Sequence, residues 1–228
     1  MSRPLLLVED EPSLSEAMGY SLEREGYRVE VAADGRQAIA SFRANAPQLV
    51  LLDLMLPQMS GVDVCKLIRS ESTVPILIVT AKDAEADKIA CLEMGADDYI
   101  TKPFSMMELI SRVRAHLRRA SLTERVEDQS TFCAGPVQID AAAHQVRVRG
   151  RIVALPPKEF DLLSALVVDA GRLMRRDYLI SEVWGSDYYG DTRTLDVHVK
   201  RLRDKIEVDP RRPRHLMTVR GLGYKFEA

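Results

Sequence analysis

The sequence predicts an α/β protein: a doubly wound, five-stranded parallel sheet followed by a smaller α+β domain. In residues 1–120, short apolar runs alternate five times with amphipathic helical patterns, which is typical of parallel strands joined by helices. In residues 134–228 the order changes to alternating strands, then helices, then a Gly-rich hairpin. Residues 121–133 show neither periodicity, so we expect a linker there.

Five strand–helix units make up the first domain. We expect strands at residues 4–10, 27–33, 49–53, 75–81 and 97–104, and helices at 12–26, 34–47, 61–70, 84–95 and 105–120. In the first helix, Leu14, Met18 and Leu22 recur every four residues and so share one face. The last helix opens with Ser105 and Glu108, at the spacing of a capping box. Ligands of such sheets bind at the carboxyl ends of the strands, so polar residues there are the candidates for a site.

The second domain has a different order of elements. Residues 137–155 alternate polar and apolar positions, as antiparallel strands joined by a turn near Gly150 would. Helices are expected at residues 156–174, 175–185 and 191–207, and a closing hairpin at 215–228 that turns around Gly221 and Gly223. This order predicts an α+β domain and not a continuation of the parallel sheet.

The composition is that of a soluble globular protein. The 228 residues are 46% apolar and 29% charged. No apolar run reaches the length of a membrane span, and the N-terminal stretch becomes acidic too early for a signal peptide. The three cysteines, Cys65, Cys91 and Cys133, lack metal-ligand spacing. We therefore expect reduced thiols and a cytoplasmic protein without membrane contact.

Charge is distributed unevenly along the chain. Residues 1–120 carry 14 Lys/Arg and 18 Asp/Glu, net −4, and residues 121–228 carry 18 and 16, net +2. Residues 192–228 alone carry 10 and 5, net +5. An acidic beginning and a basic end predict different partners for the two domains.

Polar residues occupy the carboxyl ends of four predicted strands. Glu9 and Asp10 end the first strand, Asp53 the third, Thr80 the fourth and Lys102 the fifth. Three carboxylates at one edge of a sheet repel one another, which raises at least one pKa unless a cation lies among them. Oxygen ligands without Cys or His favour a hard cation, and Mg²⁺ is the natural choice.

This set of residues fits phosphoryl transfer. Mg²⁺ and Lys102 can neutralise the oxygens of a transferring phosphoryl group, while Asp53 acts as the nucleophile and becomes an aspartyl-phosphate. Thr80 offers a hydroxyl to the same group. A single Asp at a strand end is more often a turn residue or a helix cap. The joint occurrence of these five residues at four strand ends favours the phosphoryl site.

Four separated motifs of the first domain resemble a known family. The motifs "LLLVEDEP", "VLLDLMLPQMSG", "ILIVTAKD" and "GADDYITKPF" are similar, in order, to the receiver domain of two-component response regulators, over about residues 3–120. The resemblance implies a flavodoxin-like fold, a sensor histidine kinase as partner and Asp53 as phosphoacceptor. It also implies Mg²⁺ held by Glu9, Asp10, Asp53 and the backbone carbonyl of Met55, phosphoryl contacts from Thr80 and Lys102, and Tyr99 as switch aromatic. One departure is Gln58, where the family more often has Gly.

A small apolar patch ringed by charges is expected on the last two helices of the first domain. Ile89 and Leu92 lie three residues apart and share a helix face. Such a pattern is usually a solvated face, but it also suits a self-complementary two-fold interface. It resembles the dimerisation face of OmpR/PhoB-type regulators, which implies a homodimer on phosphorylation. The interface residues implied are Lys88, Ile89, Leu92, Asp97, Asp98, Glu108, Ile110, Arg112 and Arg119, with the pairs Lys88–Glu108, Asp97–Arg112 and Asp98–Arg119.

The helix expected at residues 191–207 has an apolar face and a basic face. Leu195, Val199 and Leu202 point in one direction at about 100° per residue, and most of the cations point away. A solvated basic face is the ordinary explanation of such a helix. A Gly-rich hairpin with Arg220 follows it, however, and a helix for the major groove beside a hairpin for the minor groove is a coherent reader of double-stranded DNA.

The second domain also carries a resemblance. The stretches "KEFDLLSALVVDAGRLMRRDYLISEVWG", "TLDVHVKRLRDKIE" and "TVRGLGYKF" are similar to the winged helix-turn-helix effector domain of the OmpR/PhoB family, over about residues 135–228. This implies base contacts by Val197 and Arg201 and a minor-groove contact by Arg220. The full DNA-binding set implied is Trp184, Arg193, Thr194, Val197, His198, Lys200, Arg201, Arg203, Arg220 and Tyr224.

The same resemblance implies partners and a lineage. The DNA partner is promoter DNA with direct repeats. The loop at residues 185–191 occupies the position where this family touches RNA polymerase, although a plain turn explains that loop equally well. Within the family, the chain looks most like actinobacterial regulators of the phosphate-response type.

Two other functions use part of this pattern. Phosphatases of the haloacid-dehalogenase type also form an aspartyl-phosphate beside Asp, Thr, Lys and Mg²⁺, but they carry a second Asp two residues after the nucleophile. That position is Met55 here, so we expect a non-enzyme with at most slow autodephosphorylation. Alternatively, a DNA-binding protein could use its first domain as a dimerisation scaffold only. The complete set of pocket residues argues against this alternative.

Overall fold

The computed structural model of the chain describes residues 3–81, 90–117, 131–185, 188 and 192–228. The chain divides into two compact units, residues 1–117 and residues 118–228. Each unit has an apolar core of its own.

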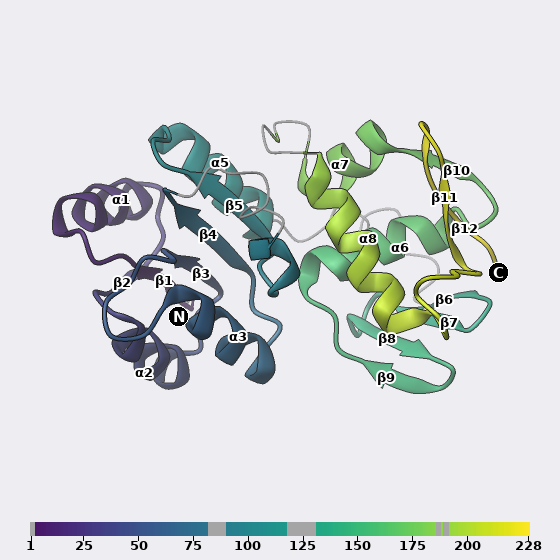
Figure 1. Cartoon of the computed structure of the whole chain (residues 1–228), viewed down its shortest axis with the longest axis horizontal. Coiled ribbons are helices and arrows are strands. Elements are labelled where there is room, and N and C mark those ends of the chain that lie inside the picture. Colours follow the sequence, from purple (N-terminus) through teal and green to yellow (C-terminus); the bar gives the residue numbers. More distant parts are fainter. Residues whose placement is uncertain (1–2, 82–89, 118–130, 186–187, 189–191) are drawn as a thin grey trace. The chain divides into compact units, whose positions relative to one another are not determined.

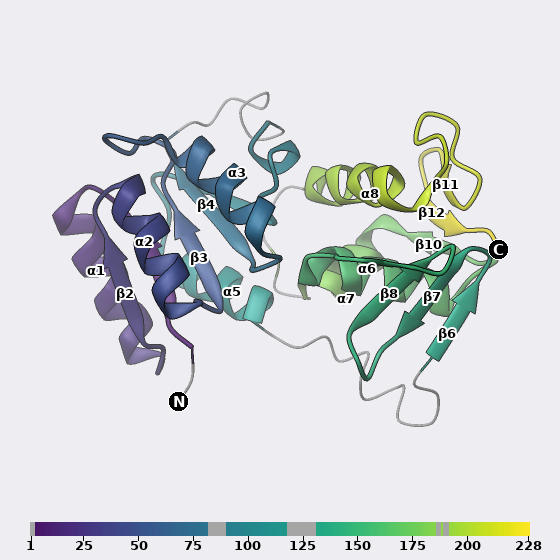
Figure 2. The ribbon, with the colours of Figure 1, turned by 90° about the horizontal axis from the view of Figure 1, so that it is seen from below.

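The first unit is a parallel sheet with helices on both faces. Its strands are β1 (Leu5–Val8), β2 (Val29–Ala32), β3 (Leu49–Leu52), β4 (Ile76–Thr80) and β5 (Asp98–Thr101), and its described helices are α1 (Pro12–Arg24), α2 (Gly35–Asn45), α3 (Gly61–Glu71) and α5 (Met106–Leu117). The strand order is β2-β1-β3-β4-β5 with every neighbouring pair parallel, which confirms the predicted doubly wound sheet. Helices α1 and α5 cover one face, and α2 and α3 cover the other (Figure 1 and Figure 2). The helix expected at 84–95 lies mostly outside the described residues, and residues 90–93 of it are helical.

Burial explains the composition of the central strands. Every residue of β1, β3 and β4 is buried, as expected for parallel strands that are covered by helices on both faces. The edge strand β2 is only partly buried. The continuous apolar runs therefore mark the middle of the sheet.

Side chains at the loop ends start the helices that follow. Asp34 accepts hydrogen bonds from two backbone N–H groups in the first turn of α2, at 2.8 and 2.9 Å. Ser60 caps α3 in the same way. At α5, the hydroxyl of Ser105 accepts from the backbone N–H of Glu108 at 3.1 Å, which confirms half of the predicted capping box. The Glu108 carboxylate does not complete the box, because it pairs with Arg112.

The described part of the second unit has two antiparallel sheets and three helices. The first sheet contains, in this order, β6 (Thr131–Ala134), β7 (Val137–Asp140), β8 (Gln145–Val148) and β9 (Arg151–Val153). The helices are α6 (Pro157–Val168), α7 (Arg176–Trp184) and α8 (Arg193–Ile206). The second sheet has the order β10-β12-β11, from β10 (Leu173–Arg175), β11 (Leu216–Val219) and β12 (Gly223–Phe226). This confirms the predicted α+β domain with its closing hairpin. Across the described residues, no helix combines the length and apolar surface that a bilayer-spanning segment requires.

Strand β6 begins inside the stretch that we expected to be a linker. Phe132 pairs with Ile139 of β7 and packs against the core. The last three residues of 121–133 therefore belong to the sheet, and the remainder of that stretch lies outside the described residues.

The helix expected at residues 156–174 ends earlier, at Val168. Gly171 has a φ of +86°, a left-handed conformation that cannot continue a right-handed helix. Its backbone N–H donates to Phe226 O at 2.8 Å. The chain then continues as β10, which pairs with β12.

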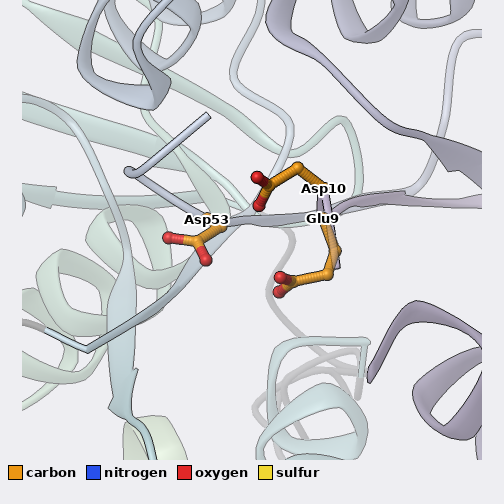
Figure 3. A group of neighbouring side chains, drawn as sticks. All are labelled: Glu9, Asp10 and Asp53. Atoms are coloured by element: carbon orange, nitrogen blue, oxygen red, sulfur yellow. The ribbon is translucent and has the colours of Figure 1, made fainter. Parts of the chain in front are cut away.

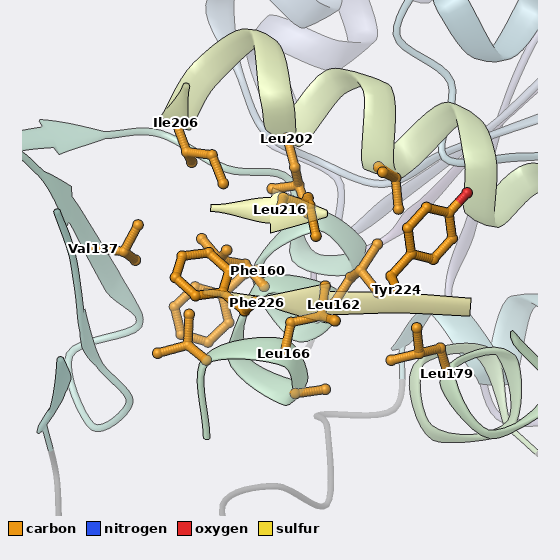
Figure 4. Close-up of a cluster of buried hydrophobic side chains, with 14 of the residues drawn as sticks. Val137, Phe160, Leu162, Leu166, Leu179, Leu202, Ile206, Leu216, Tyr224 and Phe226 are labelled. Atoms are coloured by element: carbon orange, nitrogen blue, oxygen red, sulfur yellow. The ribbon is translucent and has the colours of Figure 1, made fainter. Parts of the chain in front are cut away.

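The core of the second unit joins its helices to both sheets. Leu162 and Leu166 of α6, Leu202 of α8 and Phe226 of β12 meet in it (Figure 4). Trp184, the chain's one tryptophan, is also part of this core and is 1% exposed. Its fluorescence will therefore report on the folding of the second unit.

Glu207 holds the segment that leads from α8 to β11. Its carboxylate accepts hydrogen bonds from the backbone N–H groups of Arg214, His215 and Leu216 at 3.1, 2.9 and 2.8 Å. Burial acts to raise the pKa of Glu207, but these three hydrogen bonds outweigh burial, and the pKa lies below its usual value. The ionised form is thus the form that the fold stabilises.

We expect Glu207→Gln to destabilise the second unit by about 1–3 kcal/mol, because an amide removes the charge and leaves a backbone donor without an acceptor. Since the folded pKa is lowered, the stabilisation is complete above the ordinary Glu pKa of about 4.3 and is lost as pH falls through the folded value. Denaturation followed by Trp184 fluorescence measures the difference. The difference in free energy of unfolding between the parent and Glu207→Gln should shrink on acidification below about pH 4. Glu227→Gln, at a half-exposed carboxylate, is the control and should cost less than about 1 kcal/mol. A difference that is independent of pH would contradict the role of the charge.

Candidate functional site

Loops at the carboxyl ends of β1 and β3 place three carboxylates close together (Figure 3). Glu9 and Asp10 follow β1, and Asp53 follows β3. The backbone N–H of Asp53 donates to Val8 O at 2.9 Å, and that of Glu9 donates to Ala32 O at 3.1 Å, so sheet hydrogen bonds position both residues. One carboxylate oxygen from each of the three side chains lies within 4.8 Å of the others. Glu9 and Asp53 are buried, whereas Asp10 is exposed.

Lys102, one residue after β5, places its ammonium group between two of these carboxylates. Its Nζ lies 2.8 Å from Glu9 Oε2 and 2.5 Å from Asp53 Oδ2. Its backbone N–H donates to Thr80 O at 2.8 Å, which ties it to the end of β4. Burial lowers the pKa of Lys102, but the hydrogen bonds and charges of Asp53 and Glu9 outweigh burial and hold the pKa above its usual value. The pKa of Glu9 is raised, first by burial and further by the charge of Asp53, in spite of Lys102.

The charge of this cluster suits a divalent cation. Glu9, Asp10 and Asp53 contribute −3 and Lys102 contributes +1, so −2 remains. The candidate ligands are carboxylate oxygens alone, which is the ligand type that Mg²⁺ prefers. Among the described residues, no other group of three or more His, Cys, Asp or Glu side chains has metal-ligand spacing.

The loop after β3 is held against the sheet and against α2. The Asp53 carboxylate accepts from the backbone N–H of Met55 at 3.0 Å. A Cβ at Gly61 would lie 2.0 Å from Asp53 O, so only glycine permits this approach. Gln58 has a φ of +66°, which explains why glycine suits this position, and its amide donates to the Asp34 carboxylate at 3.3 Å. Sequence reasoning did not find the contact with Asp34, because it joins loops that are distant in the chain.

Thr80 and Tyr99 lie on neighbouring strands next to this cluster. Thr80 ends β4 and is 1% exposed. Tyr99 is in β5, opposite Ile78 of β4, and is 6% exposed. The phosphoryl contact of Thr80 and the switch role of Tyr99 stay predictions.

The predicted charge pairs of the dimer face differ from the pairs in the structure. Asp97 is fully buried and pairs with Arg69 at 2.8 Å. Asp98 is fully buried and pairs with Arg112 at 2.9 Å, with His116 at 3.5 Å. Within one chain, Asp97 and Asp98 are therefore already neutralised by Arg69 and Arg112, and the pairs Asp97–Arg112 and Asp98–Arg119 between two chains stay predictions.

Asp98 and Arg112 form a buried ion pair. Burial raises the pKa of Asp98, but Arg112 and His116 more than compensate and hold it at about 2. Arg112 is itself only 7% exposed and also pairs with Glu108. It is a core residue here and not an exposed interface residue.

The other predicted dimer residues are either buried or partly buried, or lie outside the described part of the chain. Leu92 is 1% exposed and is buried in the unit, and Ile110 is partly buried and packs against the core. Lys88, Ile89 and Arg119 lie outside the described residues. A dimer through this face stays a prediction.

The predicted DNA-binding residues divide by exposure. Arg193 and Lys200 of α8 and Arg220 of the β11–β12 turn are exposed. Arg201 and Arg203 are partly buried. Arg203 donates to the backbone carbonyl of β11 at Leu216. The buried members of the set are Trp184, Thr194, Val197, His198 and Tyr224.

Four of these buried residues have partners within the fold, and their contacts with DNA stay predictions. The Trp184 ring meets His198 edge-on, with 5.1 Å between centroids. His198 Nδ1 lies 2.8 Å from the backbone oxygen of Thr194. The hydroxyl of Tyr224 donates to Asp196, and burial, with Asp196, raises the pKa of Tyr224 to about 12. Phosphate contact by these side chains would require them to become exposed on binding.

Two family models match the chain, in the order of its two units. The model described as response regulator receiver domain matches residues 5–114, and the model described as transcriptional regulatory protein, C terminal, matches residues 150–226. Across 224 residues, the chain is 54% identical to the sensory transduction protein RegX3 of Mycolicibacterium smegmatis, with 98% of each chain covered. The chain is a two-component response regulator of the OmpR/PhoB family. Its receiver domain precedes an OmpR-type DNA-binding domain, as in regulators of transcription.

Further relatives support the same family. The response regulator is 47% identical over 225 residues to the DNA-binding response regulator MtrA of M. smegmatis, covering 99% of this chain and 97% of MtrA. Among solved structures, a mutant of RitR aligns with a TM-score of 0.80 at 25% identity over 99% of both chains. DrrB, a Thermotoga maritima OmpR/PhoB homolog, aligns with a TM-score of 0.52 at 30% identity over the whole of both chains.

Proposed function

We propose that Asp53 accepts a phosphoryl group from a sensor histidine kinase with Mg²⁺ bound, and that phosphorylation promotes dimerisation and binding to promoter DNA. The observation that carries this proposal is the contact of Lys102 with both Asp53 and Glu9, beside Asp10. That arrangement leaves a nucleophilic carboxylate next to a cation and next to ligands for a second cation.

Within this proposal, each residue has a defined part in the transfer. An Asp53 oxygen forms a bond to phosphorus while the bond from phosphorus to the donor imidazole nitrogen breaks. Lys102 then exchanges its contact with the Asp53 carboxylate for a contact with a phosphoryl oxygen, and the Thr80 hydroxyl donates to another. Glu9, Asp10, Asp53 and the Met55 carbonyl would hold Mg²⁺, and the ion would supply positive charge that neutralises the transferring group.

Met55 explains why the phosphorylated form should persist. It lies two residues after the nucleophile, and its exposed side chain cannot move a proton to or from water. Hydrolysis of the aspartyl-phosphate therefore lacks an acid/base group at this position. We propose a slow autodephosphorylation, as a signal requires.

The DNA-binding half of the proposal relies on exposed cations. Arg193, Lys200 and Arg220 project from α8 and from the hairpin turn beside it. Two such domains in a dimer would match direct repeats and raise affinity through effective concentration. We further propose a cytoplasmic location and a linker that ends before Thr131. We also propose that loop 185–191 contacts RNA polymerase; most of that loop lies outside the described residues.

The test compares the parent protein with and without acetyl phosphate and Mg²⁺. We expect light scattering to show a shift from monomer toward dimer, and fluorescence anisotropy to show tighter binding to duplexes selected from genomic fragments. Some dimer without phosphorylation is expected, because phosphorylation shifts an existing equilibrium. Incorporation of phosphate with no change in DNA affinity would reject the coupling and favour a receiver that acts as a scaffold.

A further inference from the structure

Helix α6 carries three buried charged residues, Lys158, Glu159 and Asp161, in an element that is otherwise largely apolar. Lys158 is 2% exposed and Glu159 is 1% exposed. A buried charge is unfavourable unless it is paired or hydrogen-bonded. Lys158 Nζ donates to Val183 O at 2.5 Å, near the carboxyl end of α7, and lies 3.7 Å from Asp161. Lys158 thus binds a backbone carbonyl of α7, the helix that precedes α8.

Glu159 forms ion pairs with two side chains of α8. Its Oε2 lies 2.6 Å from Lys205 Nζ, and its Oε1 lies 3.4 Å from Arg201 Nη1. Arg201 and Lys205 are four residues apart on α8, so they stand on the same side of the helix and one carboxylate reaches both. Their side chains are 12% and 32% exposed, which leaves both pairs only partly screened by water.

Arg201 is held on one side. The guanidinium group is a planar fork, so fixing one arm sets the direction of the other. Among the described residues, its second terminal nitrogen, Nη2, is buried and has no hydrogen-bond partner. One arm is therefore committed to Glu159, while the donors of the other arm are unused in the free protein and reach a base only when that arm becomes exposed.

We propose that Glu159 is a positioning residue for sequence discrimination by α8. It orients Arg201 for contact with a base edge and withholds positive charge from non-specific contact with phosphates. Helix α8 has five Lys/Arg and two Asp residues, net +3, and Glu159 reduces this to +2. The inference rests on the proposed function in one respect, namely that α8 reads DNA.

Glu159 should affect sequence discrimination because bases and phosphates compete for the same cation, Arg201. A bidentate Arg contact distinguishes bases only if the guanidinium is presented in the correct direction. A released Arg can swing to the nearest phosphate, which adds affinity without sequence information. Removing the Glu159 charge should therefore strengthen binding to any DNA and weaken the preference for the right one.

The experiment measures the affinity of Glu159→Gln for two duplexes at several salt concentrations. One duplex is selected by the parent protein from a random-sequence pool, and the other is a scrambled version of it. We expect several-fold tighter binding to the scrambled duplex and a roughly tenfold lower ratio of specific to non-specific affinity. The slope of log affinity against log salt should steepen by up to about 0.9, the value for one added phosphate contact.

Asp161→Asn is the matched control, because it neutralises another buried acid of α6, which lies 3.7 Å from Lys158 of the same helix. It should leave the ratio and the salt slope as in the parent. Glu159→Asp keeps the charge but shortens the reach, so it should lower the ratio without a steeper slope. Trp184 fluorescence confirms that each variant is folded at the temperature of measurement.

Two results would overturn the inference. One is an equal loss of affinity for both duplexes in Glu159→Gln, with the ratio and slope unchanged, since that is the mark of a merely structural role. The other is a further fall in the ratio of specific to non-specific affinity when Glu159→Gln is added to Arg201→Gln, since without Arg201 the carboxylate has no base-reading side chain left to position. A parent protein that shows no preference for any duplex would instead reject the proposed function.

Discussion

Replacing Asp53 by Asn is expected to abolish phosphorylation of the chain by acetyl phosphate and Mg²⁺. The amide lacks the negative charge and the nucleophilic oxygen that attack on phosphorus requires. It also replaces one of the three candidate metal-binding carboxylates, which is one of the two that Lys102 contacts, by a neutral amide. Intact-protein mass spectrometry detects the added phosphoryl group directly.

A suitable control for this variant is Asp63→Asn. Asp63 is an exposed carboxylate in the first turn of α3, beyond the same loop, and its side chain accepts from the Ser60 hydroxyl at 2.7 Å. It should be phosphorylated as the parent is. Undiminished phosphorylation of Asp53→Asn would show that the nucleophile is elsewhere. A lost modification in both variants would point to a disturbed loop and not to a missing nucleophile.

Replacing Arg112 by Met is expected to destabilise the first unit by about 3–5 kcal/mol. Methionine fills much of the same volume, but it leaves the fully buried Asp98 without its main partner. Circular dichroism follows this transition, and Trp184 fluorescence, which reports on the other unit, should change little. A loss below about 1 kcal/mol would mean that water reaches Asp98.

The dependence on pH separates the charge from the packing. In the parent, the pKa of Asp98 is about 2, below its ordinary value, so its stabilisation is present at neutral pH and is lost only as pH falls toward 2. Without Arg112, burial should raise that pKa, and a raised pKa favours folding at low pH. The difference between parent and variant should therefore narrow on acidification. Arg114→Met, on the same helix but 60% exposed, is the control and should cost about 0–1 kcal/mol.

These results also bear on how dimerisation should be tested. Reversing Arg112 to Glu would place a second carboxylate beside buried Asp98 and so disturb the fold itself. Any loss of dimer in that variant would have two explanations. Substitutions at exposed positions are needed to examine the face.

The sheet and its site could be predicted from the sequence because both depend on local order along the chain. Continuous apolar runs marked β1, β3 and β4, and the residues that end them are Glu9, Asp53 and Thr80. In a parallel sheet, the ends of successive strands meet at one edge whatever the details of packing. The clustering of the three acids with Lys102 follows from this geometry.

The sequence also located the helix and hairpin of the second unit, but it did not show which of their residues are buried. Trp184 and His198 have polar atoms that suit phosphate contacts, yet both are buried and their rings meet. Helical periodicity assigns a residue to a side of its own helix. It does not say what packs on that side.

By itself, then, the sequence determined the order of the elements, the two domains and the identity of the acidic cluster around Asp53. Only the tertiary structure decided the partners of the charges, because those partners are far apart in the chain. Asp97 is 28 residues from Arg69, and Glu159 is 42 residues from Arg201. A buried charge takes whichever opposite charge the packed fold brings within reach, since leaving it unpaired costs several kcal/mol (about 3–5). Local sequence patterns therefore do not predict the partner of a buried charge.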